Sequence, residues 1–202
     1  MLIRLLANVG DDDLAQKNAA DLHAAYLVDP GSVEPNVAAA AAAVVASKGG
    51  PMEYDVFLNK YKNPATPQEE RRYQSALSSF PGGTEMERTL AMTLSGDVRT
   101  QDAPYLLAVC LRNREQGPLA WQFIKDNWTQ INDAFPSNSI VRMLSGITSL
   151  SNPPLADDVF AFFESHEVPQ GHLTLKQTLE KLRVNTALRE REKASFSRHL
   201  TR

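Results

Sequence analysis

The chain has 202 residues, a net charge of −3 at pH 7 and a single cysteine, Cys110. This slight negative charge gives no electrostatic reason to expect binding to nucleic acid or to an anionic membrane. One cysteine excludes a disulfide framework within the chain, and no apolar run approaches the roughly 18 residues that a membrane-spanning helix needs. No signal peptide is recognisable at the N-terminus, so we expect a cytoplasmic protein.

Helical periodicity runs through almost the whole chain, and the alternation typical of strands is absent. Clusters of Pro and Gly separate the expected helices. These helices are 2–8, 12–28, 35–48, 52–62, 67–79, 85–95, 102–114, 117–135, 138–150, 155–166 and 173–200. The first one begins with no residue in front to cap it, so we expect a fragment of a longer protein. The predicted fold class is all-α, with a long C-terminal helix.

Several helix starts carry capping patterns. Thr66, Thr84 and Thr174 are each followed three residues later by Glu or Gln, which is the capping-box pattern. The run Asp11–Asp13 is predicted to form the N-cap and first turn of the second helix, where negative charge is favourable. The run Glu69–Arg72 is predicted to be a solvated face with local ion pairs.

The spacing of the helices indicates a repeat. Helix pairs begin near residues 35, 67, 102 and 138. This spacing is close to that of helical-pair solenoids of the HEAT or armadillo kind, although the signature residues of TPR repeats are absent. We therefore predict a single domain, 1–202, that forms an α/α superhelix of HEAT/armadillo-like helix pairs. An irregular helical bundle remains the alternative.

No motif in the chain predicts an active site. His166 and His172 are six residues apart, whereas a zinc-binding helix needs two histidines four residues apart. Cys110 lies in an apolar helix, where a thiol is inert. Neither a Gly-x-Ser-x-Gly turn nor a phosphate-binding loop is present. We predict no catalytic residue and no metal ligand.

One amide interrupts an apolar face. In PLAWQFIKDNW (118–128), Asn127 falls on the same side of the helical wheel as Trp121 and Trp128. A buried amide without a partner costs about 1–3 kcal/mol. We predict that Asn127 binds the backbone of a neighbouring inter-helix turn, and that both tryptophans are core anchors.

Several segments together resemble a known family. They are YDVFLNKYKNPATPQEERRYQSAL, SGDVRTQDAPYLLAVCLRNREQGPLAWQFIKDNW, IVRMLSGITSL, DVFAFFESH and TLKQTLEKLRVN. In this order they resemble the C-terminal domain of zinc aminopeptidases of the aminopeptidase N and puromycin-sensitive type. The resemblance implies a HEAT-like superhelix that partners the catalytic domain of the same parent chain and helps to enclose its peptide substrate.

The resemblance also implies that catalysis resides elsewhere in the parent chain. The His-Glu-x-x-His zinc helix, a further glutamate ligand and the Gly-x-Met-Glu-Asn loop of this family are absent here. By this reading the chain alone is not an enzyme and holds no cofactor, whereas the parent is a zinc-dependent metalloprotease.

Two arginines are candidates for substrate contact. Arg112 matches the position of an arginine that contacts the far end of the peptide in some relatives, and Arg142 is a weaker candidate. A guanidinium can hold a carboxylate through two parallel hydrogen bonds. An arginine near unpaired carbonyls at a helix end is the structural alternative for Arg112. Two other functions stay open: a free-standing α-solenoid that binds peptides or proteins, and a self-contained hydrolase with an unfamiliar site.

Overall fold

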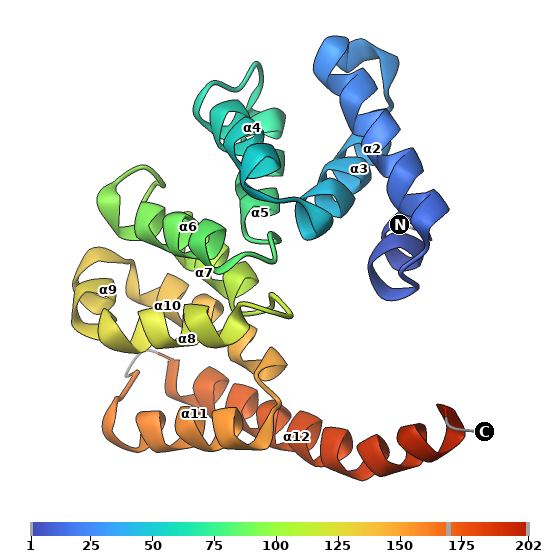
Figure 1. Ribbon diagram of the computed structural model, residues 1–202. Coiled ribbons are helices and arrows are strands. Elements are labelled where there is room, and N and C mark those ends of the chain that lie inside the picture. Colours follow the sequence, from blue (N-terminus) through green and yellow to red (C-terminus); the bar gives the residue numbers. More distant parts are fainter. Residues whose placement is uncertain (1, 169–170, 201–202) are drawn as a thin grey trace. The chain divides into compact units, whose positions relative to one another are not determined.

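The computed structural model describes residues 2–168 and 171–200, and within them the regular elements are all helices (Figure 1). These described residues form α-helices, two short 3₁₀ helices and one π-helical stretch, with no strand. The predicted all-α class and the long C-terminal helix are therefore confirmed. In the described part of the chain, no helix is both long and apolar enough to cross a membrane.

The chain divides into two compact units, residues 1–89 and residues 90–202. The first contains α1 (Leu2–Arg4), the π-helical η1 (Leu5–Val9), α2 (Asp13–Val28), the 3₁₀ helix η2 (Pro30–Ser32), α3 (Pro35–Lys48), α4 (Pro51–Lys62) and α5 (Pro67–Leu77). Helix α6 (Gly83–Ser95) runs across the division. The second unit contains α7 (Ala103–Cys110), α8 (Gly117–Asp126), α9 (Trp128–Ala134), α10 (Ser137–Met143), the 3₁₀ helix η3 (Leu144–Ser149), α11 (Pro153–Ser165) and α12 (His172–Leu200).

Proline marks the starts of helices, as the spacing of Pro and Gly predicts. It is the first residue of α3, α4, α5 and α11. Proline suits this position because its missing N–H would have no intrahelical partner there, and because its φ is already helical. The predicted starts agree with Pro35 and Pro67, whereas α4 begins one residue and α11 two residues before the predicted start.

Capping chemistry is confirmed at two helix starts and wrong at two others. The Oδ1 atom of Asp12 accepts from the N–H of Ala15 at 2.7 Å, and the Oγ1 atom of Thr66 accepts from the N–H of Glu69 at 3.1 Å. Thr84 and Thr174 are not caps, because α6 begins at Gly83 and α12 begins at His172. Both threonines therefore lie inside their helices.

The core of the N-terminal unit contains a charged group that we predicted to be solvated. Glu69 is buried, where one carboxylate oxygen accepts from the N–H of Ala65 at 2.7 Å and the other lies 3.5 Å from the Nζ atom of Lys60. Arg72 lies over the ring of Tyr26 at 4.7 Å. The predicted solvated face of 69–72 is therefore wrong at these two residues, because α5 packs against α3 and α4.

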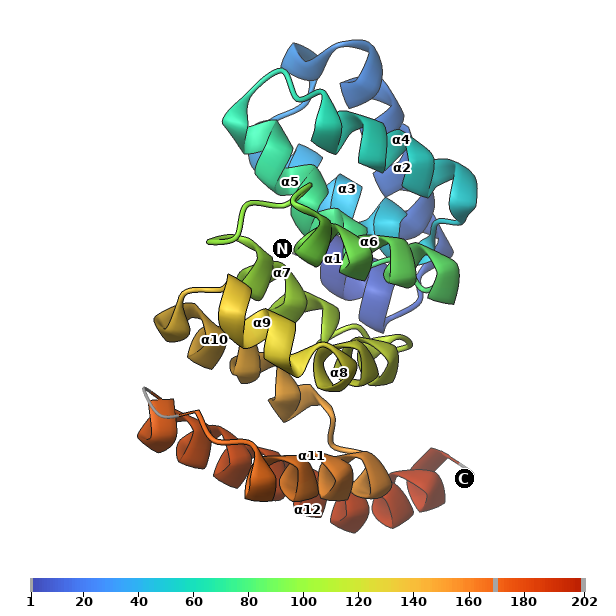
Figure 2. The same ribbon diagram turned by 90° about the vertical axis from the view of Figure 1, so that its left-hand side faces the viewer.

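The C-terminal unit is held together both by neighbouring helices and by helices that are further apart in the chain. Helix α7 packs against α10 and η3, and α12 packs against η3 and α11. Both ribbon views show α11 alongside α12 (Figures 1 and 2). All five residues that we proposed as sites lie in this unit.

Candidate functional site

Arg112 lies just after α7 and is held by the following helices of the same unit. Its Nη2 atom donates to the Oγ atom of Ser145 at 2.9 Å, while the side chain remains exposed. Ser145 reaches this position because the next residue is a glycine. A Cβ atom on Gly146 would lie 2.6 Å from the carbonyl oxygen of Ala108 and 2.7 Å from the Cβ atom of Leu111. The missing side chain thus allows η3 to approach the end of α7 closely.

Arg142 lies near the same junction. It is exposed in α10, three residues before Ser145, and residues three apart along helical backbone are neighbours on one face. In the described part of the chain, neither Arg112 nor Arg142 has a carboxylate within ion-pair distance. The end of α7 and the α10–η3 junction therefore carry two exposed arginines.

Asn127 marks a break in the helix that we predicted to run from 117 to 135. Helix α8 ends at Asp126 and α9 begins at Trp128, and Asn127 has φ −112° and ψ 18°. Its Nδ2 atom donates to the carbonyl oxygen of Phe123 at 2.8 Å. The predicted partner, a neighbouring inter-helix turn, is therefore wrong: the side-chain amide binds the preceding turn of its own segment, at a carbonyl that also accepts from the backbone N–H of Asn127.

The two tryptophans on either side of this break are buried against α11. Trp121 and Trp128 lie edge-on to the ring of Phe162, with centroid separations of 5.2 Å and 5.3 Å. Such edge-to-face pairs add about 0.5–1.5 kcal/mol beyond the burial of the rings. The rings join the α8–α9 segment to α11 within this unit.

Asp158 of α11 provides a polar anchor for the same contact. Its Oδ2 atom accepts from the Nε1 atom of Trp121 at 2.6 Å and from the Nζ atom of Lys125 at 2.7 Å. The hydrogen bond from Lys125 holds the pKa of Asp158 below its ordinary value, and the bond from Trp121 adds to this effect. Sequence reasoning missed Asp158, because the residue lies 33 positions after Lys125 and belongs to no motif.

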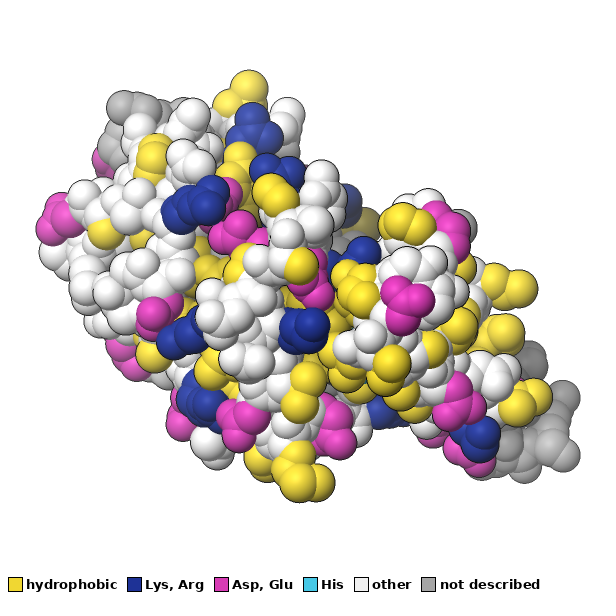
Figure 3. Space-filling model, turned by 90° about the horizontal axis from the view of Figure 1, so that it is seen from above, with side chains coloured by type: hydrophobic (Ala, Val, Ile, Leu, Met, Phe, Trp, Pro, Cys, Tyr) yellow, Lys and Arg dark blue, Asp and Glu magenta, His cyan; other side chains and the backbone are white. Residues whose placement is uncertain are grey.

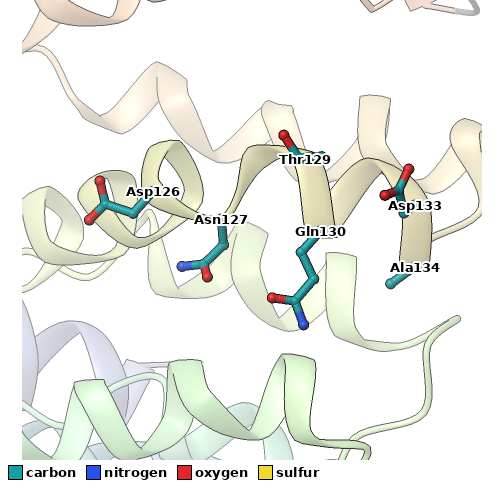
Figure 4. Close-up of a pocket in the computed structure, with 6 residues that line it drawn as sticks. All are labelled: Asp126, Asn127, Thr129, Gln130, Asp133 and Ala134. Carbon is teal, nitrogen blue, oxygen red and sulfur yellow. The ribbon is translucent and has the colours of Figure 1, made fainter.

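An open depression of about 510 Å³ lies over the helix break (Figure 4). Asp126 and Asn127 line it at the end of α8, and Thr129, Gln130, Asp133 and Ala134 line it on α9. These side chains offer hydrogen-bonding groups and two carboxylates. Among the described residues, the hydroxyl of Thr129 forms no hydrogen bond with either carboxylate, so this lining supports binding rather than bond-breaking chemistry.

The remaining groups of chemical interest are structural. Cys110 is fully buried, and burial raises the pKa of its thiol to about 12, so the thiolate is not formed at neutral pH. The ring of His166 stacks on Phe162 at 3.8 Å between centroids. Within the described residues, no group of three or more His, Cys, Asp or Glu side chains could hold a metal ion. The described side chains therefore do not fit a zinc site.

Comparisons with known proteins identify a family and several relatives of this chain. Residues 1–184 match the family model described as ERAP1-like C-terminal domain. Aminopeptidase M1 of Arabidopsis thaliana is 30% identical over 192 residues, which are 91% of this chain and 21% of that protein. Aminopeptidase M1-B of Oryza sativa subsp. japonica is 32% identical over 135 residues, and endoplasmic reticulum aminopeptidase 1 of Homo sapiens is 29% identical over 137 residues.

These matches cover only a small part of the relatives. The shared region is 65% of this chain and 15% of the rice protein, and the same shares apply to the human protein. The chain thus spans about a fifth or less of the length of these curated relatives. Because the family model matches nearly the whole sequence, the chain belongs to the family of ERAP1-like C-terminal domains.

Proposed function

We propose that this chain is the non-catalytic C-terminal part of a zinc-dependent aminopeptidase, a hydrolase that removes N-terminal residues from peptides. The observation that carries this proposal is the family match over residues 1–184, together with relatives that are named as aminopeptidases. Zinc would be held by the catalytic part of the longer polypeptide, since the described residues here lack a suitable group of ligands.

The proposed role is to enclose the substrate chamber. In this proposal the helix pairs stack as one HEAT-like α-superhelical domain, and the catalytic part of the same polypeptide is the partner. The contacts of α2 with α3 and of α4 with α5 support such pairing within the N-terminal unit. The cytoplasm is the proposed compartment, supported only by the single buried thiol.

Arg112 and Arg142 would hold the far end of the peptide. Both guanidinium groups are exposed, and the side-chain partner of Arg112 is the neutral hydroxyl of Ser145. The positive charge of Arg112 thus remains available for the terminal carboxylate of a peptide. Ser145 would orient the guanidinium and leave its other N–H groups free to form a bidentate pair.

Replacing Arg112 with Ala in the longer enzyme tests this role. A hydrogen bond to a charged group contributes about 1.5–3 kcal/mol, so KM for a peptide with a free C-terminal carboxylate should rise roughly 10- to 100-fold. The same peptide with an amidated C-terminus should show little change. Arg114→Ala is the matched control, because Arg114 is also exposed and lies two residues away. An equal loss with both peptides would refute carboxylate binding by Arg112.

A further inference from the structure

A groove of about 320 Å³ lies between the end of α11 and the first half of α12, within the C-terminal unit. Three apolar side chains and four charged or titratable side chains line it, and neither Arg112 nor Arg142 is among them. Small-molecule sites are typically cavities of about 300–1,000 Å³ that combine apolar walls with a few polar groups. The groove has both features, so it is a candidate binding site on elements that the proposed function does not use.

The apolar part of the groove is built from one aromatic ring and two leucines. Phe163 of α11 has its ring centroid 5.9 Å from those of both Trp121 and Trp128, so the aromatic cluster of this unit holds the ring in place. On α12, Leu175 and Leu179 also line the groove, and residues four apart share one face of a helix. Leu175 is buried, whereas Phe163 and Leu179 are partly exposed. These three side chains can cover a short apolar chain.

Basic side chains follow the same side of α12. His172, Lys176 and Arg183 all line the groove, and their separations of four and seven residues place them on one side of a helix. Two contacts position Arg183. The central carbon of its guanidinium lies 5.2 Å from the ring centroid of Phe160, and its Nη1 atom donates to the Oε2 atom of Glu180 at 2.7 Å. The carboxylate of the lining is therefore paired with one of the basic groups.

Basic groups outnumber acidic groups in this lining. At pH 7 Lys176 and Arg183 carry one positive charge each and Glu180 carries one negative charge, which leaves one excess positive charge with His172 counted as neutral. Because Glu180 is paired with Arg183, this excess charge is that of Lys176. By contrast, acidic and basic side chains lie close to one another on the face that Figure 3 displays. The groove therefore combines an apolar floor with a single excess positive charge.

We propose that this groove binds a small amphiphilic carboxylate, such as a medium-chain fatty acid. The alkyl chain would lie against Phe163 and the two leucines, and the carboxylate would accept from the ammonium group of Lys176. A carboxylate fits because its single negative charge equals the excess charge of the lining, and because a hydrogen bond between charged partners is stronger than a neutral one. Arg183 can add a further donor, since a guanidinium has five N–H groups and only part of them face Glu180.

Titration of the ¹⁵N-labelled 202-residue chain with octanoate, followed by NMR at fixed ionic strength, tests the proposal. Saturable shifts should be centred on the backbone amides of α11 and the first half of α12. Octanol and octylammonium carry the same chain without the negative charge, and both should bind at least about fivefold more weakly. Hexanoate lacks two methylene groups, each contributing roughly fourfold to affinity when fully buried, so it should also bind at least about fivefold more weakly.

Two lysine variants separate this site from general attraction of anions. Lys176→Gln should weaken the binding of octanoate roughly threefold and leave that of octanol unchanged. Lys181→Gln is the matched control, because Lys181 is also exposed on α12 but does not line the groove, and it should change neither. Equal affinities for octanoate and octanol, or equal losses in the two variants, would overturn the proposal. Shifts centred on the end of α7 and η3 would place the carboxylate at Arg112 and overturn it as well.

Discussion

Lowering the pH from 7 to 5 should destabilise the N-terminal unit through His23. This residue is buried in α2, where its Nε2 atom lies 3.1 Å from the hydroxyl oxygen of Tyr73 and its ring lies 4.9 Å from that of Phe57. Burial, together with the nearby positive charges of Arg72 and Lys60, lowers the pKa of His23 to about 4. The folded chain therefore keeps this imidazole neutral at pH values where an unfolded chain would protonate it.

The sign and size of the effect follow from the two pKa values. The group has a pKa of 6.5 when unfolded and about 4 when folded, so the unfolded state binds more protons between these values. The stabilisation is fully present above pH 6.5 and is lost as the pH falls toward 4. Linkage of the two values gives a loss of about 2 kcal/mol at pH 5 and about 3 kcal/mol at pH 4.

Urea unfolding followed by circular dichroism, compared between the wild type and His23→Gln, isolates this contribution. Glutamine can still form a hydrogen bond with the hydroxyl of Tyr73 but does not titrate. Carboxylates also titrate in this range, so the relevant quantity is the difference in pH dependence between the two proteins. The free energy of unfolding of the wild type should fall about 2 kcal/mol further than that of the variant. Equal pH dependence in both proteins would refute the reasoning.

Three further predictions concern the C-terminal unit. This unit contains both tryptophans, so urea unfolding followed by tryptophan fluorescence can test all three predictions. Asp158→Asn should lower the free energy of unfolding by about 1 kcal/mol, because the ion pair with Lys125 is partly exposed, whereas Asp157→Asn on the exposed side should have no effect. Gly146→Ala should cost about 1–3 kcal/mol, because its new Cβ atom would overlap the backbone of α7; an unchanged midpoint would show that η3 can move away freely. Asn127→Ala should cost about 1 kcal/mol, the contribution of one hydrogen bond to a helix end, and a core-sized loss would contradict the geometry seen here.

Helix positions could be predicted well from the sequence because the residues that start a helix act locally. A proline fixes its own φ and removes its own N–H, so the starts of α3 and α5 can be read from Pro35 and Pro67 without knowledge of the rest of the molecule. The break at Asn127 was missed because no such local signal marks it. The apolar pattern continues across it, and a helical wheel assumes a continuous helix.

Burial of charged residues depends on partners that are distant in the sequence. Glu69 and Arg72 look like part of a solvated face when only 69–72 are considered. Their partners include Tyr26, on a helix more than forty residues earlier, and Lys60 on α4. No local pattern carries this information. The environment of His23, which depends on Tyr73, was missed in the same way.

The candidate site was predicted only in part. Arg112 came from resemblance to a family, and its hydrogen bond to Ser145 depends on a close approach that Gly146 allows. The sequence does not show whether a glycine is needed for a close contact or for a turn, so the role of Gly146 could not be predicted. Substrate contact by Arg112 and Arg142 stays a prediction.

The central claim is that this chain forms the C-terminal part of a zinc aminopeptidase. Sequencing the transcript upstream of the codon for Met1 tests it most directly. The account predicts a continuous open reading frame that encodes His-Glu-x-x-His and a further glutamate ligand downstream of it, as a zinc peptidase requires. An in-frame stop codon directly upstream of Met1 would contradict the account, and this chain would then be a free-standing helical protein.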